Sequence, residues 1–302
     1  MSAAPRTVMV ASGRERRNAL LQSAVFALTF LATVVVIAPI VVVSAYVLRE
    51  GVSAITLEFL LEGPRRDGRE GGIFPVIVLT GYTLVLVVLM AVPVGVASAV
   101  FLSEYARPGR LLRLINLTII NLAGVPSIVY GLFGAALFLD ILGASKALWV
   151  VAATLALQAL AIIITSARES LLSVPQGIRE GSLALGVSKL RTTAFVTLPQ
   201  ALPGIVTGVL LAISRAAGET APVLVVGAII AKNVDLAPSA VVNERAQSLS
   251  FELYGRIVQG IGYPEERKWG IALVLLAFVL VFNLSALFLR GRIASIGSVR
   301  RN

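Results

Sequence analysis

Arg215 and Glu219 are charged residues inside a long apolar run of this sequence. Residues four apart on a helix share a face, so the two side chains can form an ion pair. A charge within the hydrocarbon costs about 2.5–3.5 kcal/mol on insertion scales, and such charges tend to mark functional paths. The planar, permanently charged guanidinium of arginine matches the oxygens of a phosphate group. The sequence therefore predicts an anion site at Arg215, with a purely structural Arg215–Glu219 pair as the alternative.

The residues that follow this pair predict a weakened helix. Pro222 lacks the backbone donor that would bond to the Gly218 carbonyl, so a polar group is left free near Glu219. A helix weakened beside a guanidinium is a candidate anion site, and Thr220 is a further candidate for the path at Arg215 and Glu219.

Other polar or small residues lie in apolar runs. Asn121 and Ser127 flank the helix breaker Pro126 and are further candidates for the path, although hydrogen bonding between helices explains them almost as well. Gln158 is interpreted as such a helix-to-helix contact. Gly204 and Gly208 form a small-xxx-small pair, which predicts close helix packing.

Composition defines the class of protein. Hydrophobic residues make up 57% of the 302 residues, charged residues 14%, and the mean hydropathy is +0.91, which is typical of a membrane protein. The net charge of +10 comes from basic residues at the ends of apolar runs, which indicates membrane topology rather than nucleic-acid binding. The chain contains neither Cys nor His. Disulfides are therefore excluded, and we expect no metal site and no membrane enzyme.

Apolar runs long enough to cross about 30 Å of hydrocarbon predict an all-α integral membrane protein with six transmembrane helices. The first run is too long for a signal-peptide core and is expected to be retained. The remaining organisation is a basic tail at 1–18, the first helix with an external loop at 19–72, a transmembrane domain at 73–290 and a second basic tail at 291–302. The predicted spans are Ala19–Leu48, Ile73–Leu102, Leu111–Leu139, Ala147–Ala167, Ala201–Ala231 and Trp269–Leu289.

The distribution of charge predicts orientation. Both tails and the loops after the second and fourth spans carry more bases than acids, whereas residues 49–72 carry four Arg against five acids. Residues 232–268 carry five of each. The positive-inside rule then places both termini in the cytoplasm of a multi-pass protein in the plasma (inner) membrane. Of the two external segments, 49–72 is expected to be irregular, and 232–268 to contain one short helix at Leu249–Val258.

A polar insert between the fourth and fifth spans, about residues 175–199, is predicted to be a coupling element. Pro175 can start a helix that continues to Leu185, and Gly186 permits a sharp turn. A second amphipathic helix follows at Val187–Val196, and Pro199 and Pro203 are expected to interrupt it before the fifth span. Two short helices joined by a tight turn can dock into a groove of a soluble partner.

The insert resembles the EAA loop of ABC-importer permeases, in which a Glu-Ala-Ala group precedes a Gly and then a Leu-Pro pair. The residues that carry this resemblance, and that it assigns to contact with an ATP-binding subunit, are Glu180, Gly181, Ser182, Gly186, Leu198 and Pro199.

The chain also resembles the phosphate-specific ABC-importer permeases of the PstA type. Gly218-Glu219-Thr220-Ala221-Pro222 is similar to their Gly-Glu-Thr-Ala-Pro signature, with Arg215 in the expected place. The stretch 121–134 (NLAGVPSIVYGLFG) resembles a segment shared with the sister PstC type. At the end of the fourth span, relatives carry Arg-Thr-Thr-Glu where this chain has residues 165–169 (TSARE), so no role is transferred to Arg168.

The resemblance implies a MetI-like, type I permease fold. It also implies a phosphate importer with a PstC-like second permease, a PstB-like ATP-binding dimer and an external PstS-like phosphate-binding protein. The chain has no nucleotide-binding Gly-x-x-x-x-Gly-Lys loop, so ATP and Mg²⁺ are expected on the partner and no cofactor on this chain. The alternatives are a permease for another oxyanion or an amino acid, and an ATP-independent channel or carrier.

The predicted topology can be tested by cysteine labelling, because the natural chain has no thiol. Ser188→Cys should resist an impermeant reagent added outside intact cells, whereas Ser239→Cys should react. Labelling of Ser188→Cys from outside would contradict the orientation.

Overall fold

The computed structural model describes residues 13–258, 260 and 263–299 and divides the chain into two compact units, residues 1–50 and 51–302. Helix α1 (Gly13–Gly51) makes up the described part of the first unit and ends at the boundary. Its apolar side chains are exposed along most of its length. A helix that is apolar on all sides needs lipid or protein around it.

The second unit begins at residue 51, so it includes the segment between the first helix and the transmembrane domain predicted at 73–290. The reason is the packing of residues 51–72 within this unit. Phe59 is buried in a cluster with Leu249 and Ile271, and the guanidinium of Arg267 lies 5.2 Å from its ring centre.

Membrane-length helices agree in number with the six predicted spans. Among the described residues, five helices are long and apolar enough to cross a membrane, and a sixth span results if one bent pair counts as one. The last helix continues to Val299, through most of the predicted tail at 291–302. The four long helices described in the second unit are α3 (Phe74–Val100), α6 (Leu148–Leu172), α9 (Leu198–Gly218) and α13 (Glu265–Val299).

The third predicted span is not one straight helix. It is formed by α4 (Arg110–Ala123) and α5 (Ser127–Gly134), whose axes differ by 103°, and a π-helical stretch extends α5 to Ile141. Pro126 precedes α5 and cannot continue α4, which explains the break.

The fifth predicted span, Ala201–Ala231, differs from the structure at both ends. Helical residues run from Lys189 without the predicted interruption at Pro199 and Pro203. Pro199 lies in the first turn of α9, where a helix tolerates the missing backbone donor. The residues before α9, Thr193–Thr197, form a π-helical turn. The span then ends at Gly218, and a separate short helix, α10 (Ala221–Val226), follows.

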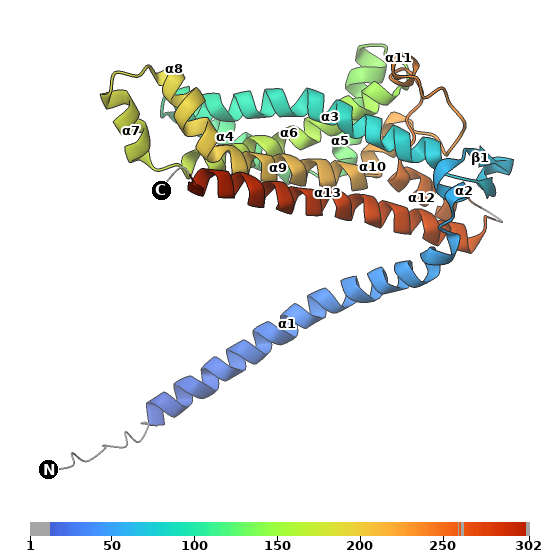
Figure 1. Cartoon of the computed structure of the whole chain (residues 1–302), viewed down its shortest axis with the longest axis horizontal. Helices are drawn as coiled ribbons and strands as arrows, with labels where there is room; N and C mark the ends of the chain where they lie inside the picture. Colours follow the sequence, from blue (N-terminus) through green and yellow to red (C-terminus); the bar gives the residue numbers. More distant parts are fainter. Residues whose placement is uncertain (1–12, 259, 261–262, 300–302) are drawn as a thin grey trace. The chain divides into compact units, whose positions relative to one another are not determined.

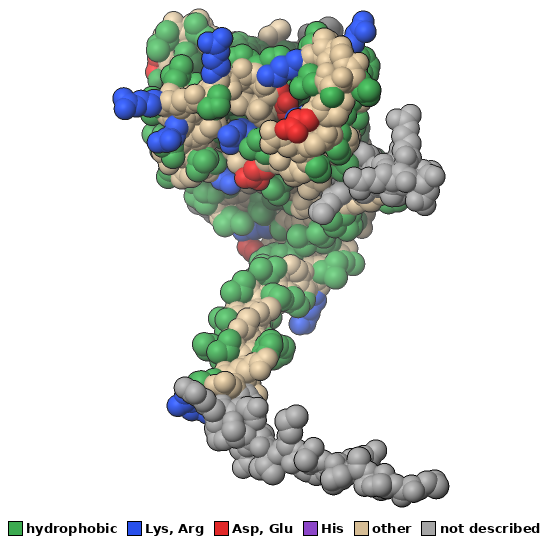
Figure 2. All heavy atoms as spheres, turned by 90° about the vertical axis from the view of Figure 1, so that its left-hand side faces the viewer, with side chains coloured by type: hydrophobic (Ala, Val, Ile, Leu, Met, Phe, Trp, Pro, Cys, Tyr) green, Lys and Arg blue, Asp and Glu red, His purple; other side chains and the backbone are tan. Residues whose placement is uncertain are grey.

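The core of the second unit lies where α3, α6 and α9 pack together, with α13 against α9 (Figure 1). The short helices α7 (Gln176–Ala184) and α8 (Lys189–Thr192) lie at one end of these long helices, which we call the α7 end. Figure 2 views this end, and Lys and Arg side chains are spread over it with fewer Asp and Glu.

The two segments predicted to be external lie at the opposite end (Figure 1). Residues 51–72 are more regular than predicted, because they include a two-stranded antiparallel hairpin with the pairs Pro64–Gly71 and Arg65–Glu70. The predicted helix at Leu249–Val258 is confirmed as α12. The elements here are two 3-10 turns (Val52–Ala54 and Arg66–Gly68), α2 (Leu57–Leu61), β1 (Pro64–Arg65), β2 (Glu70–Gly71), α11 (Pro238–Val241) and α12.

A buried ion pair holds the hairpin to α12. Arg256 Nε lies 2.7 Å from Glu252 Oε1, and the two side chains are 8% and 1% exposed. Arg256 also donates to the carbonyl of Asp67 (2.6 Å), and Arg267 donates to the carbonyl of Gly71 (2.6 Å). The second oxygen of Glu252 accepts from the Ala231 backbone (2.6 Å). These contacts order a segment whose own sequence is rich in glycine.

Arg256→Gln should lower the midpoint of thermal unfolding of the purified protein clearly. Removing one partner of a buried pair leaves the other charge uncompensated, at a cost of about 3–5 kcal/mol. Arg66→Gln is the matched control, because its pair with Glu70 is exposed and is worth about 0–1 kcal/mol. Equal midpoints for the two variants would contradict a structural role of the buried pair.

Candidate functional site

Arg215 and Glu219 lie at the point where α9 ends. Arg215 Nε is 3.3 Å from Glu219 Oε1, so the predicted pair is present, with side chains 48% and 13% exposed. The backbone of Glu219 is already extended (φ −71°, ψ 127°). The pair therefore spans the end of the helix instead of lying along its surface.

Glu219 has two further partners. Gln158 on α6 donates from Nε2 to Glu219 Oε1 at 2.6 Å, and Ser250 on α12 donates to the Glu219 carbonyl at 2.7 Å. Sequence reasoning had interpreted Gln158 only as a helix-to-helix contact. Its approach to Glu219 had no sequence signal beyond the presence of one amide in an apolar helix. The carboxylate therefore joins α9 and α6, and the backbone carbonyl of the same residue joins α12 to them.

The helix break follows the pattern that Pro222 predicted. Thr220 precedes α10, and Pro222 lies in the first turn of that helix. Thr220 is half-buried and makes no side-chain cap to α10, whereas Gly218 is exposed. Thr220 directly follows Glu219 in the chain, at the break between α9 and α10.

The second break, between α4 and α5, packs against the first. A Cβ at Gly131 of α5 would lie only 2.8 Å from Pro222 Cα, so α5 and α10 approach closely. Tyr130 donates to the Leu122 carbonyl at the end of α4 (2.9 Å), in addition to the bond that this carbonyl accepts from the Val125 backbone (3.0 Å).

Asn121 and Ser127 lie on either side of this second break. Asn121 is exposed and Ser127 is half-buried. Within the described residues, no hydrogen bond connects either side chain to Arg215 or Glu219. The structure therefore brings together the elements that carry these residues, but not the four side chains.

Gly204 and Gly208 lie where α9 approaches α6. A Cβ at either glycine would come within 2.3 Å of a serine side chain, that of Ser170 or Ser166. Close packing of this kind is what small residues permit between membrane helices.

A partly polar groove of about 530 Å³ runs along the same contact. Its polar side chains are those of Ser166, Glu169, Ser170 and Thr207. On α9, positions 204, 208, 211 and 215 recur at helical spacing and share a face, so the groove leads from the side of Arg215 toward the α7 end.

Arg168, to which no role was transferred, is partly buried, and its Nε has no hydrogen-bond partner in the structure.

The insert at residues 175–199, predicted to be a coupling element, has the expected two-helix form. Gly186 lies in the turn between α7 and α8 with φ +76°, and Ser188 caps α8. Ser182 and Thr192 are joined through their hydroxyl groups at 2.9 Å. Glu180 and Gly181 are exposed, Leu198 is half-buried and Pro199 is exposed. Large apolar side chains that remain exposed here are Leu183, Leu185, Leu190 and Phe195.

Arg179 fixes this element to the end of the second span and was missed by sequence reasoning. Its guanidinium lies 3.1 Å from Glu104 Oε1 and donates to the Val174 (2.8 Å) and Leu171 (2.5 Å) carbonyls. Each residue looked like an ordinary loop charge in the sequence, because 75 positions separate them.

The described residues contain no group of three acidic side chains placed to hold a metal ion.

Residues 91–295 match the family model described as "Binding-protein-dependent transport system inner membrane component". The chain belongs to this family.

Curated relatives agree with this membership. "Phosphate transport system permease protein PstA 1" of Mycobacterium tuberculosis (strain CDC 1551 / Oshkosh) is 36% identical over 266 residues, covering 86% of each chain. "Phosphate transport system permease protein PstA" of Mycobacterium leprae is 34% identical and covers 84% of each. "Probable ABC transporter permease protein YqgI" of Bacillus subtilis is 30% identical and covers 86% of this chain and 91% of that one.

Solved structures share the fold. A chain of the MetNI methionine ABC transporter superposes with a TM-score of 0.55 at 21% identity, covering 74% of this chain and 94% of that one. A chain of a bacterial ABC transporter that imports alginate gives a TM-score of 0.62 at 11% identity, covering 92% and 97%. The predicted ABC-importer permease fold is confirmed.

Proposed function

We infer that this chain is the transmembrane permease subunit of an ATP-driven importer of inorganic phosphate. The observation that carries this inference is Arg215, a guanidinium on a membrane-spanning helix that remains 48% exposed although its Nε is paired with Glu219. Its remaining donors can bind the oxygens of an anion. The relatives that are named as phosphate transport permeases support phosphate as the anion.

The phosphate path passes the two helix breaks. Discontinuous helices are a recurrent way of building substrate sites near the middle of the membrane. In this proposal Arg215 binds phosphate, while Glu219 orients the guanidinium and Gln158 holds the Glu219 carboxylate in place. Thr220, Asn121 and Ser127 contribute polar atoms to the path, and the groove lined by Ser166, Ser170 and Thr207 leads away from it.

The element at residues 175–199 transmits the energy of ATP hydrolysis, which takes place on a separate subunit that binds ATP and Mg²⁺. Its exposed leucines and phenylalanine suit insertion into a groove of a soluble partner. Arg179 and Glu104 carry its displacement to α3, and the continuous helix from Lys189 carries it to Arg215.

The complete importer contains four kinds of subunit. This chain pairs with a second permease, and the two bind a dimer of ATP-binding subunits at the α7 end. An external protein delivers phosphate at the opposite end, where the β1–β2 hairpin lies. The bundle then alternates between outward-facing and inward-facing states. The α7 end and both termini are cytoplasmic, a placement that the excess of basic residues supports.

Replacing Gly186 with Ala should reduce ATP-driven phosphate uptake about tenfold, because a left-handed residue with a Cβ costs about 1–2 kcal/mol. Gly177→Ala is the matched control, since both glycines have open space around them but only Gly186 has positive φ. Uptake is measured at equal membrane insertion of the variants. Normal uptake by Gly186→Ala would refute the requirement for this turn.

The role of Arg215 is tested with Arg215→Gln, Glu219→Gln and the double variant, at matched expression and complex assembly. We expect Arg215→Gln and the double variant to abolish phosphate uptake and Arg215→Lys to restore little, because the planar fork is lost. Arg66→Gln controls for loss of charge elsewhere.

Recovery of uptake in the double variant would overturn the role of Arg215 in the phosphate path. It would mean that the two charges only neutralise each other, since removing both then leaves no unpaired charge in the membrane.

A further inference from the structure

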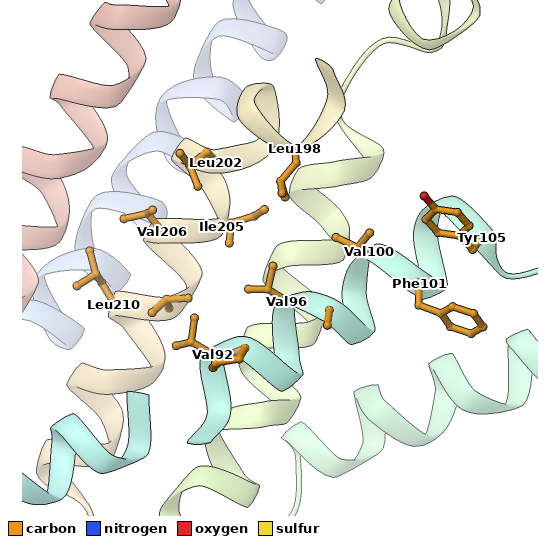
Figure 3. Close-up of a pocket in the computed structure, with 13 residues that line it drawn as sticks. Val92, Val96, Val100, Phe101, Tyr105, Leu198, Leu202, Ile205, Val206 and Leu210 are labelled. Carbon is orange, nitrogen blue, oxygen red and sulfur yellow. The ribbon is translucent and has the colours of Figure 1, made fainter. Parts of the chain in front are cut away.

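An apolar groove of about 950 Å³ lies between the C-terminal half of α3 and the N-terminal half of α9 (Figure 3). We call it the α3–α9 groove. Its walls include Val92 and Val96 from α3, Phe101 from the π-helical turn Phe101–Tyr105 that continues α3, and Leu202, Val206 and Leu210 from α9. The hydroxyl of Tyr105 is the only polar side-chain group among its lining residues, and Tyr105 lies beside Lys189 of α8.

The shape of this lining favours flexible acyl chains over a packed helix. Helix contacts in membranes are enriched in small residues that let backbones approach, as Gly204 and Gly208 do between α9 and α6. The α3–α9 groove is lined mostly by Val, Leu and Ile, and such branched side chains keep a second helix backbone at a distance.

Basic residues lie at or follow the end of the groove where Tyr105 is found. Lys189 Nζ lies 5.1 Å from the centre of the Tyr105 ring. Arg107 and Arg110 follow Tyr105 in the chain and are exposed. The nearby acid, Glu104, is largely buried and paired with Arg179, so it does not offset these charges. The predominance of basic side chains on the α7 end is visible in Figure 2.

We propose that the α3–α9 groove binds an anionic phospholipid, with an acyl chain along the groove and the headgroup phosphate beside Lys189 and Arg107. Apolar clefts with a basic rim at the membrane surface are suited to such lipids. Tyrosine is common at this depth, because its ring is apolar and its hydroxyl is polar. The ligand is separate from the transported phosphate, since Arg215 is not part of this groove.

The site would connect the lipid to the coupling element. Lys189 belongs to α8, whereas Tyr105 and Arg107 follow α3, so a headgroup between them joins the two. The lipid thereby reinforces the connection that Arg179 of α7 makes to Glu104 after α3.

The test uses the complete importer in detergent, analysed by native mass spectrometry after addition of phosphatidylglycerol or phosphatidylcholine. We expect the wild-type complex to retain more phosphatidylglycerol than phosphatidylcholine. Ala97→Trp should abolish this retention, because Ala97 lines the groove and is exposed, so that the indole fills the space without entering the core. Val94→Trp is the matched control, since Val94 lies on the same helix and is exposed outside the groove.

Lys189→Gln should lower the retention of phosphatidylglycerol about fivefold, the effect of one basic side chain near an anionic lipid surface. Arg66→Gln, at the other end of the unit, should leave it unchanged. Equal retention of the two lipids by the wild type, or unchanged retention in Ala97→Trp, would overturn the proposal. So would cross-linking of Ala97→Cys to the second permease, because a protein helix would then cover the groove.

Discussion

A carboxylate on a membrane-spanning segment is stable only if polar or charged groups surround it, and Glu219 has partners from three helices. Arg215 and Gln158 bind its side chain, and Ser250 binds its backbone carbonyl. The carbonyl is free to accept that bond because α9 has already ended at Gly218. The contacts of Glu219 thus fix the depth at which α9 stops and the direction in which α10 starts.

The second break obeys the same constraint. Irregular backbone within a membrane is tolerated only where protein or a polar cavity satisfies its hydrogen bonds. The Leu122 carbonyl at the end of α4 accepts from both the Val125 backbone and the Tyr130 hydroxyl, and Gly131 lets α5 lie directly against Pro222 at the start of α10. The two breaks therefore support each other, and polar backbone gathers around one position in an otherwise apolar unit.

From this position, a continuous helical path leads to the α7 end. Residues Lys189–Gly218 form a helical stretch of 30 residues, about 45 Å long. Its first turn is α8 and its last turn carries Arg215. A movement imposed at α8 can reach the guanidinium without passing through a loop. The unexpected continuity through Pro199 and Pro203 is what makes this possible.

The sequence by itself determined the features that depend on neighbours within a few turns. The length of apolar runs predicted six spans, the spacing of four predicted the Arg215–Glu219 pair, and Gly186 marked the turn with positive φ. These follow from local geometry and from the cost of exposing polar groups to lipid. Only the tertiary structure decided which helix faces meet. It brought Gln158 to Glu219 across 61 positions and Arg179 to Glu104 across 75, and it ordered the hairpin through Arg256. The physical reason is that the sequence around a single amide or arginine side chain is the same whichever partner that side chain binds. The partner is selected by the packing of segments that lie far apart in the chain.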